Sequence, residues 1–232
     1  MGSFDQKCVR VLDFQTRRSL QELVGHTGGV MSLKFDRNIL LSASRDRTVK
    51  MWDMTTGANA ATFTEHVASV WCLDWDGGFN CVSGSEDRLV KLWDLKSGKC
   101  IHTYTGHTKG IGSITFDSRY VASGSRDKTI RLWDQRMRRC LHTYKGHTNS
   151  VRCLSFDERK LVSGSWDNTI KIWDLVTGEQ TKNLKGHTDR VLTLQFDDYK
   201  IGHNYPLAHI QFDESKIISG SRDLTVRVWD FS

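Results

Sequence analysis

Short runs of β-branched and aromatic residues alternate with Gly, Asp, Ser and Asn along most of the chain. In one representative stretch these runs occupy residues 110–116, 120–123, 130–133 and 140–144, and a polar Asp117-Ser118-Arg119 segment separates the first two. Runs of this length between turn-forming residues favour strands, and no segment shows the 3.6-residue period of an amphipathic helix. The pattern therefore predicts an all-β chain of short strands joined by tight turns.

The strand pattern returns with a period near 40 residues. Its clearest mark is a Trp-Asp pair, which begins at Trp52, Trp93, Trp133, Trp173 and Trp229. Successive pairs are 41, 40, 40 and 56 residues apart, and a degenerate Leu12-Asp13 copy precedes the first. A Gly-His dipeptide or a variant lies upstream of each pair, with Ser-Gly-Ser-x-Asp or a variant in between. Because one small sheet cannot bury both of its faces alone, the repeats are expected to stack.

These motifs, in this order and spacing, resemble the WD-repeat family over essentially the whole chain. The resemblance implies an all-β WD-repeat β-propeller of five to six four-stranded blades, with an irregular last blade whose closure is left open. We expect a partial blade at 1–24, complete repeats at 25–65, 66–105, 106–145 and 146–185, an orphan inner strand at 186–201, and a last repeat at 202–232.

The last repeat is irregular because residues 186–201 are echoed by residues 202–217. His203 precedes Ser219 by 16 residues, as His107 precedes Ser123, so we expect the second copy to be in phase. The first copy would then supply an inner strand without partner strands. An outer strand near residues 19–24 is a candidate to complete the last blade and remove its open edge.

His, Ser, Asp and Trp recur at fixed intervals, and this set suggests two alternatives. A hydrolase triad needs a nucleophile, a base and a group that orients the base. The same set in each repeat is implausible as an active site, because catalytic sites are few per protein. The WD-repeat resemblance instead implies one buried hydrogen-bond chain in each blade. The expected sets are His26, Ser42, Asp46, Trp52; His66, Ser83, Asp87, Trp93; His107, Ser123, Asp127, Trp133; His147, Ser163, Asp167, Trp173; and His203, Ser219, Asp223, Trp229.

Motifs for other chemistries are missing from the sequence. No metal-ligand spacing, P-loop, dinucleotide fingerprint or nucleophile elbow is present. We therefore expect no enzyme activity, no catalytic residue, no metal, no cofactor and no small-molecule substrate. The six cysteines include no C-x-x-C pair and are expected to be small buried thiols.

A net charge of +6 and a pI near 9.0 raise nucleic-acid binding as a competing function. Much of this charge is spread by the repeat itself, at Lys50, Lys91, Arg131, Lys171 and Arg227. A distributed charge makes a weak groove reader, so we do not expect nucleic acid as the main partner. No apolar run reaches the roughly 18 residues of a membrane helix, and no secretory signal is present. We expect a cytoplasmic or nuclear protein, or one found in both places.

The short turn between the first two strands, as in residues 156–161, resembles the WD domains of F-box/WD-repeat substrate receptors of ubiquitin ligases. This resemblance implies that two positions in each repeat point to a narrow top face: the residue before the Asp of Ser-Gly-Ser-x-Asp and a residue early in the innermost strand. The peptide-binding candidates are Arg45, Trp71, Arg126, Arg152, Trp166 and Arg222.

Arg126 and Arg152 match arginines with which one such receptor type grips phosphorylated peptides, while Gly112 stands where a further Arg is expected. Guanidinium groups bind phosphate bidentately. We therefore expect a protein-interaction domain whose partners are proteins or phosphopeptides. Any link to ubiquitin-ligase subunits would run through a segment that this chain does not contain. The alternatives are a structural scaffold that assembles a complex through its blade sides and an RNA-associated adaptor.

Overall fold

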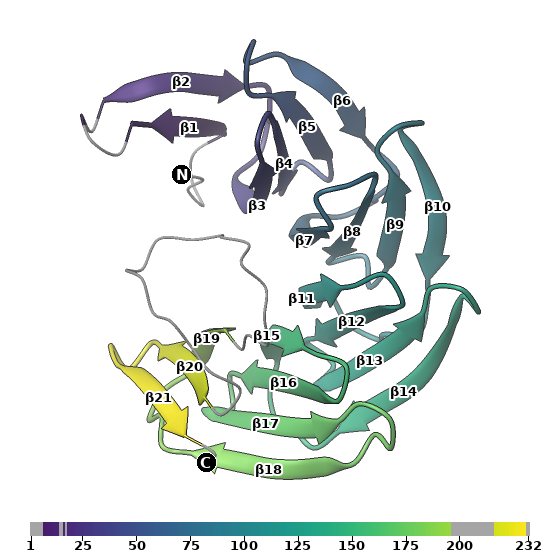
Figure 1. Ribbon diagram of the computed structural model, residues 1–232, viewed down its shortest axis with the longest axis vertical. Helices are drawn as coiled ribbons and strands as arrows, with labels where there is room; N and C mark the ends of the chain where they lie inside the picture. The colour runs from purple at the N-terminus through teal and green to yellow at the C-terminus, as the bar shows by residue number, and fades with distance from the viewer. Residues whose placement is uncertain (1–6, 14–15, 17, 196–215, 231–232) are drawn as a thin grey trace. The chain divides into compact units, whose positions relative to one another are not determined.

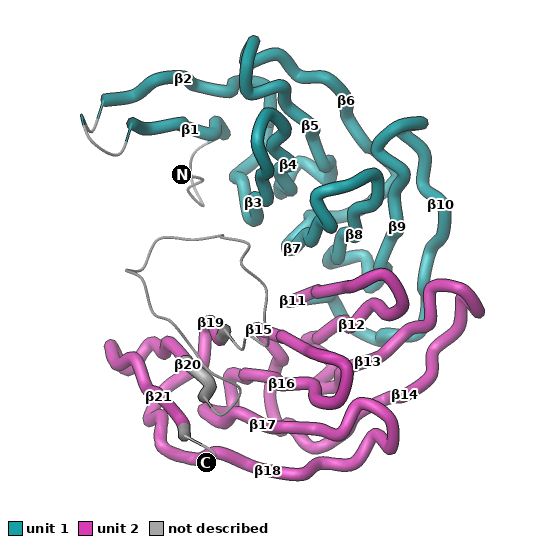
Figure 2. Tube along the Cα trace, in the orientation of Figure 1, with its two compact units in different colours: residues 1–111 teal, residues 112–232 magenta. Residues whose placement is uncertain are grey.

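A computed structural model of the chain describes residues 7–13, 16, 18–195 and 216–230. Within these residues every helix or strand present is a β-strand, as the sequence pattern predicts (Figure 1). The chain divides into two compact units, residues 1–111 and residues 112–232 (Figure 2).

The first unit begins with a two-stranded antiparallel sheet, in which β1 (Cys8–Leu12) pairs with β2 (Ser19–Val24). Two four-stranded sheets follow. One contains β3 (Val30–Asp36), β4 (Ile39–Ser44), β5 (Val49–Asp53) and β6 (Asn59–Phe63). The other contains β7 (Val70–Trp75), β8 (Asn80–Ser85), β9 (Val90–Asp94) and β10 (Lys99–Tyr104).

The second unit contains two further four-stranded sheets and one sheet of three strands. The first comprises β11 (Ile111–Phe116), which starts at the boundary residue, β12 (Tyr120–Ser125), β13 (Thr129–Asp134) and β14 (Arg139–Lys145). The next comprises β15 (Val151–Phe156), β16 (Lys160–Ser165), β17 (Thr169–Asp174) and β18 (Gln180–Lys185). The last comprises β19 (Val191–Gln195), β20 (Lys216–Ser221) and β21 (Val226–Asp230).

Each expected complete repeat, 25–65, 66–105, 106–145 and 146–185, contains one of the four-stranded sheets. Consecutive strands pair antiparallel within each sheet, so every connection is a short turn. The expected partial blade at 1–24 contributes the two strands β1 and β2, and the strand predicted near residues 19–24 is β2.

The expectation of an orphan strand at 186–201 is wrong. Strand β19 pairs with β20, with Val191 opposite Ser221 and Leu194 opposite Ser219, so it is the innermost strand of the last sheet. Residues 202–215, where the in-phase copy was expected, lie outside the described residues. The repeat spacing predicts the second copy only if the turn between the first two strands has a fixed length. The entropy of loop closure rises only slowly with length, so a long insertion there leaves the pairing intact.

The hydrophobic core lies between neighbouring sheets of the same unit. In the first unit, Val49 and Phe63 from one sheet pack with Val70 and Trp93 from the next. In the second unit, Ile130 and Tyr144 pack with Val151 and Trp173 in the same way. These side chains are almost completely buried. Stacking of small sheets, each unable to form a core alone, is therefore what stabilises each unit.

The glycine of the Ser-Gly-Ser motif is required by this close stacking. A Cβ built on Gly124 would lie 2.7 Å from Cγ1 of Val151, and one built on Gly164 would lie 2.7 Å from Cγ1 of Val191. Both partner residues begin the innermost strand of the following sheet. Any larger residue would have to displace that strand, so the neighbouring sheet packs directly on the glycine backbone.

Candidate binding rim and buried polar chains

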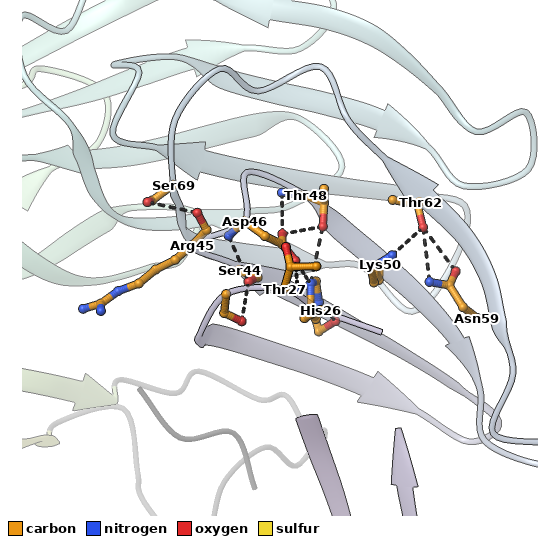
Figure 3. A network of polar contacts seen from close by, with 12 residues as sticks. His26, Thr27, Ser44, Arg45, Asp46, Thr48, Lys50, Asn59, Thr62 and Ser69 are labelled. Carbon is orange, nitrogen blue, oxygen red and sulfur yellow. Dashed lines mark hydrogen bonds and ion pairs between the residues drawn. The ribbon is translucent and has the colours of Figure 1, made fainter. Parts of the chain in front are cut away.

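Each repeat places a tryptophan, a serine, a histidine and an aspartate in one continuous polar chain. In the first four-stranded sheet Trp52 Nε1 donates to Ser42 Oγ at 2.8 Å, and that oxygen lies 2.7 Å from His26 Nε2. His26 Nδ1 in turn lies 2.6 Å from Asp46 Oδ2 (Figure 3). The strand order therefore brings together residues that are 26 positions apart in the sequence.

Equivalent chains occur in two of the other four-stranded sheets, and the third shows the tryptophan–serine bond of such a chain. The His66 set has His–Asp87, His–Ser83 and Trp93–Ser83 distances of 2.7, 2.8 and 2.7 Å. The His147 set has distances of 2.7, 2.8 and 2.8 Å to Asp167, to Ser163 and between Trp173 and Ser163. In the remaining sheet Trp133 Nε1 donates to Ser123 Oγ at 2.8 Å, and His107 is buried. The sets proposed from the sequence therefore lie where the repeat placed them.

The last sheet differs from the expectation in one residue. His187, and not His203, lies 2.9 Å from Asp223 Oδ2 and 2.7 Å from Ser219 Oγ. Trp229 Nε1 donates to the same Ser219 oxygen at 2.9 Å. Both ring nitrogens of His187 therefore use the partners that had been assigned to His203, which lies outside the described residues. The histidine belongs to the segment just before β19, as it does before every other innermost strand.

Every member of the polar chain has a hydrogen-bond partner when all donors point from the tryptophan toward the aspartate. In the tautomer that carries its proton on Nδ1, the indole N–H donates to the serine oxygen, the serine O–H donates to histidine Nε2, and histidine Nδ1–H donates to the aspartate. Ser42, Ser83, Ser123 and Ser163 are fully buried. A hydroxyl in this position does not reach a substrate. A fully satisfied buried network instead fixes one arrangement of the sheet.

The aspartates of these chains are held ionised. Burial alone would raise the pKa of the Asp46 carboxyl, but hydrogen bonds from His26, Thr48 and the Thr27 amide outweigh it and hold the pKa well below its ordinary value. Thr48 donates through its amide at 3.0 Å and through Oγ1 at 2.6 Å (Figure 3). Against the same effect of burial, equivalent hydrogen bonds lower the pKa values of Asp87 and Asp167. The carboxylate therefore serves as a fixed acceptor for the turn.

The turn that carries each aspartate requires a left-handed residue directly after it. These residues are Arg47, Arg88, Lys128, Asn168 and Leu224, with φ between 65° and 73°. Side chains other than Asn and Asp adopt this conformation at a cost. The aspartate hydrogen bonds described above offset that cost, and the turn is thereby fixed in one geometry.

Two candidate positions in each repeat lie at the same end of the sheet. The residue before the aspartate donates its amide to a carbonyl that directly precedes the innermost strand of the same sheet. These bonds are Arg45 to Gly29, Glu86 to Ser69, Trp166 to Ser150 and Arg222 to Arg190, at 2.9, 2.9, 2.9 and 3.0 Å. We call this end of the sheets the rim. The bonds place the turn candidates beside the start of the innermost strand.

A β-bulge shapes the rim. The pairing register skips one residue near the start of the innermost strand, as between Val70 and Cys72 and between Val151 and Cys153. The skipped residues are Met31, Trp71, Arg152 and Leu192. A bulge takes a side chain out of the in-and-out alternation of a strand and re-aims it. Trp71 and Arg152 therefore lie at positions where the backbone itself departs from the ladder.

In the first unit the structure brings Arg45 and Trp71 together. The guanidinium carbon of Arg45 lies 5.7 Å from the centre of the Trp71 ring, within the range of a cation–π contact. The Arg45 carbonyl accepts a hydrogen bond from Ser69 Oγ at 3.3 Å (Figure 3). Arg45 is exposed and Trp71 is half-buried. This pair forms a basic and aromatic contact at the rim of the first unit.

In the second unit Arg152 Nη1 donates to the Gly112 carbonyl at 3.1 Å, which fixes the position of its guanidinium. A Cβ built on Gly112 would lie 2.8 Å from the Val151 carbonyl oxygen. The further arginine that the receptor resemblance suggested at this position therefore does not fit without a backbone shift. Arg126 is half-buried in the turn after β12.

Arg190 is a rim residue that the sequence analysis missed. Its guanidinium lies 4.4 Å from the centre of the Trp166 ring, and its carbonyl accepts the Arg222 amide. Arg222 is exposed and its Nε lies 4.0 Å from Asp189 Oδ2. The position of Arg190 corresponds to Gly29, Ser69, Gly110 and Ser150 in the other repeats, so a charge there is a visible departure from the repeat. The second unit thus carries Arg152, Trp166, Arg190 and Arg222 along one connected rim.

The described residues show no other chemistry. Among them, no group of three His, Cys, Asp or Glu side chains is placed to hold a metal ion. No helix in the described part of the chain is long and apolar enough to cross a membrane. All six cysteines are free; Cys72, Cys81 and Cys153 are buried as expected, but Cys8, Cys100 and Cys140 are only half-buried. The expectation of buried thiols therefore holds for three of the six.

Small antiparallel sheets, stacked within each unit and tied internally by an indole–hydroxyl–imidazole–carboxylate chain, define a WD-repeat β-propeller protein. Residues 17–53, 57–94, 98–134, 138–174 and 178–230 each match the family model described as "WD domain, G-beta repeat". The chain belongs to this family, and the fold class expected from the sequence is confirmed. The last matched segment, 178–230, runs from before His187 to Asp230. The irregular last part of the chain therefore matches the family as one repeat.

Two curated relatives match short stretches of the chain, and one of them is named as a ubiquitin-ligase subunit, as the sequence resemblance suggested. Cell division control protein 4 of Saccharomyces cerevisiae is 44% identical over 71 residues, which cover 30% of this chain and 9% of that protein. The probable E3 ubiquitin ligase complex SCF subunit sconB of Talaromyces marneffei is 50% identical over 48 residues, or 21% of this chain and 7% of that protein. The aligned stretches are thus a small part of both relatives.

A solved structure is similar over nearly the whole chain. The crystal structure of the computationally designed Ika8 protein has a TM-score of 0.83 and 30% sequence identity, and covers 99% of this chain and 66% of that chain. The similarity supports the assignment of the fold.

Proposed function

We propose that the chain is a protein-interaction domain that binds peptides, including phosphorylated ones, at its rim, and that it acts as the recognition part of a ubiquitin-ligase receptor. The observation that carries the proposal is the row of Arg152, Trp166, Arg190 and Arg222 at one end of the sheets in the second unit. The name of the sconB relative supports the link to ubiquitin ligation.

The chemistry of the rim suits an acidic or phosphorylated peptide. Guanidinium groups bind phosphate oxygens bidentately, and tryptophan supplies an apolar wall for the peptide side chains. Arg152 is pre-oriented by the Gly112 carbonyl, so less conformational entropy is lost when a ligand binds. Catalysis is not part of the proposal, because the only repeated hydrolase-like residues are the buried polar chains. Such a domain would work in the cytoplasm or the nucleus.

The test replaces Arg126 and Arg152 with Ala and measures binding of a fluorescein-labelled phosphothreonine peptide library and of its unphosphorylated counterpart. Loss of a charge-assisted hydrogen bond to phosphate is expected to weaken binding at least about tenfold per arginine. Arg159→Ala is the matched control, because Arg159 is exposed in the turn at the opposite end of β15.

Three outcomes separate the alternatives. Phosphorylation-dependent binding that Arg126→Ala/Arg152→Ala abolishes supports the proposal. Partner binding that survives both substitutions supports a scaffold that assembles complexes through its blade sides. Binding that ignores phosphorylation and falls steeply with salt would indicate an RNA-associated adaptor instead.

A further inference from the structure

The turn between β13 and β14 departs from the other repeats in its charge (Figure 1). Residues 136–139 read Arg-Met-Arg-Arg and carry three positive charges. The corresponding turns, at residues 55–58, 96–99 and 176–179, read Thr-Thr-Gly-Ala, Lys-Ser-Gly-Lys and Val-Thr-Gly-Glu, with formal charges of 0, +2 and −1. The fold of the sheet therefore does not require a cluster of arginines at this turn.

Arg138 takes the place of a glycine at a backbone position that favours glycine. Its φ is 53°, and the equivalent Gly57, Gly98 and Gly178 have φ values of 75°, 72° and 77°. A residue with a side chain adopts this left-handed conformation at an energetic cost that glycine avoids. The other repeats thus show which residue suits the turn best, and this turn carries an arginine instead. Strained residues of this kind concentrate at functional sites.

Arg119 adds a fourth guanidinium group from the neighbouring turn. The Gln135 amide donates to the Arg119 carbonyl at 3.0 Å, so the turn after β11 lies against the turn after β13. Both turns are at the end of the sheet opposite the rim. Five exposed residues of these turns form what we call the basic patch: Arg119, Arg136, Met137, Arg138 and Arg139.

The aspartates nearest to the basic patch in the sequence bind the backbone of the turns. Asp134 is 4% exposed, and its Oδ1 accepts the amides of Arg136 and Met137 at 2.8 and 2.7 Å. Asp117 Oδ1 accepts two amides of its own turn at 2.7 and 2.6 Å. Within the part of the chain that the structure describes, none of the four guanidinium groups forms an ion pair. The basic patch therefore presents arginines of one sign of charge to an external anion.

The composition of the basic patch indicates which anion fits it. Guanidinium groups bind carboxylates bidentately. Met137 is 59% exposed between Arg136 and Arg138, so a ligand that pairs with the arginines also meets an apolar side chain. The phosphate backbone of a nucleic acid has no apolar group to place there, whereas an acidic peptide has one when an apolar residue interrupts its acidic residues. Four charges on two adjacent turns suit a short segment of this kind.

We propose that the basic patch is a second binding site, which takes a short acidic segment of a partner protein with an apolar residue between its acidic residues. The carboxylates pair with Arg119, Arg136 and Arg139, and the apolar side chain packs on Met137. Arg138 adds its charge at the cost of a strained turn. This site lies at the opposite end of the sheet from the rim and does not depend on the proposed function.

The probe is a fluorescein-labelled synthetic peptide of the sequence Glu-Asp-Glu-Leu-Glu-Asp-Glu, titrated with the full chain at low ionic strength. Arg136→Ala/Arg139→Ala is expected to weaken saturable binding at least about fivefold, because two exposed ion pairs are lost. Lys96→Ala/Lys99→Ala is the matched control, because it removes two exposed charges from the same turn positions of the β7–β10 sheet. It should change binding less than about twofold, whereas nonspecific charge attraction would weaken equally with either pair.

Two further measurements test the apolar contact and the strained turn. The Met137→Ser chain, and a peptide with serine in place of leucine, should each bind about threefold more weakly. Arg138→Gly should weaken binding at least about twofold and raise Tm by about 2–4 °C, because glycine relieves the left-handed strain. An arginine with a structural role alone would not weaken binding while its removal stabilises the chain. Thermal unfolding of every variant checks that it is folded.

Several results would overturn the proposal. These are absence of saturable binding, equal losses in the arginine and lysine variants, or a serine peptide that binds as well as the leucine peptide. The Arg126→Ala/Arg152→Ala chain should bind within about twofold of wild type, and loss of binding there would place the peptide on the rim instead. Tighter binding of a short single-stranded DNA or of phosphatidylserine vesicles, abolished by Arg136→Ala/Arg139→Ala, would assign the basic patch to nucleic acid or to a membrane.

Discussion

Ser163 is the centre of the polar chain in the β15–β18 sheet, and Ser163→Ala is expected to be strongly destabilising. Its oxygen accepts the Trp173 indole N–H at 2.8 Å and lies 2.8 Å from His147 Nε2. Removing the hydroxyl leaves two buried polar atoms without partners, at about 1–3 kcal/mol each. We expect a loss of about 3 kcal/mol in the free energy of unfolding. For a chain of this size that corresponds to a fall in Tm of about 6–12 °C.

The assay is urea and thermal unfolding of wild type, Ser163→Ala, Trp173→Phe and the double variant. Because Trp173→Phe removes the indole N–H that Ser163→Ala leaves unpaired, the double variant should lose about 1–2 kcal/mol less than the two single losses together. Ser118→Ala, at an exposed turn position, is the control and should change stability by less than about 0.5 kcal/mol. A Ser163→Ala chain as stable as the control, or strictly additive losses, would refute the idea that the hydroxyl links the network.

Two further predictions concern the turns that carry the aspartates. Leu224 holds a left-handed φ of 65° while 96% exposed, so Leu224→Asn should raise the free energy of unfolding by about 0.5–1 kcal/mol, and an unchanged or lower Tm would contradict this. The lowered pKa of Asp167 means that its stabilising contribution is present above the unfolded pKa of about 3.9 and is lost as pH falls through the lower folded pKa. Urea midpoints should therefore fall below about pH 4 in wild type, and less steeply in Asp167→Asn; equal acid slopes would count against the assignment.

The sequence predicted the repeated features well because each is fixed by local pairing. The Trp173, Ser163 and His147 positions lie on consecutive strands of one sheet or just before its first strand, so a constant turn length carries their spacing directly into space. The four complete repeats therefore emerged with usable boundaries. The rim positions were located by resemblance, and the bulge at Trp71 and Arg152 explains why these side chains leave the strand alternation.

The errors arose where local spacing stopped determining the pairing. The repeat spacing favours His203 over His187, because His203 keeps the normal distance to Ser219. Strand register depends instead on hydrogen bonds and packing, and a longer loop costs little. Arg190 was missed because its position is occupied by Gly or Ser in the other repeats, and its contact with Trp166 depends on tertiary structure. The prediction that residues 19–24 complete the last blade is wrong for the described residues, because β2 pairs with β1 and the last sheet contains β19, β20 and β21.

The absence of a side chain at Gly124 and Gly164 determines which positions of this fold can mutate without altering the spacing between neighbouring sheets. These glycines act as spacers of minimal thickness, since the following inner strand touches them directly. The distance between adjacent layers is thus set by the strand backbone and not by the turns that carry Trp166 or Arg222. Mutations at those turns can alter ligand preference while the layer spacing is preserved, whereas a single added methyl group at a spacer would disturb every contact across that layer.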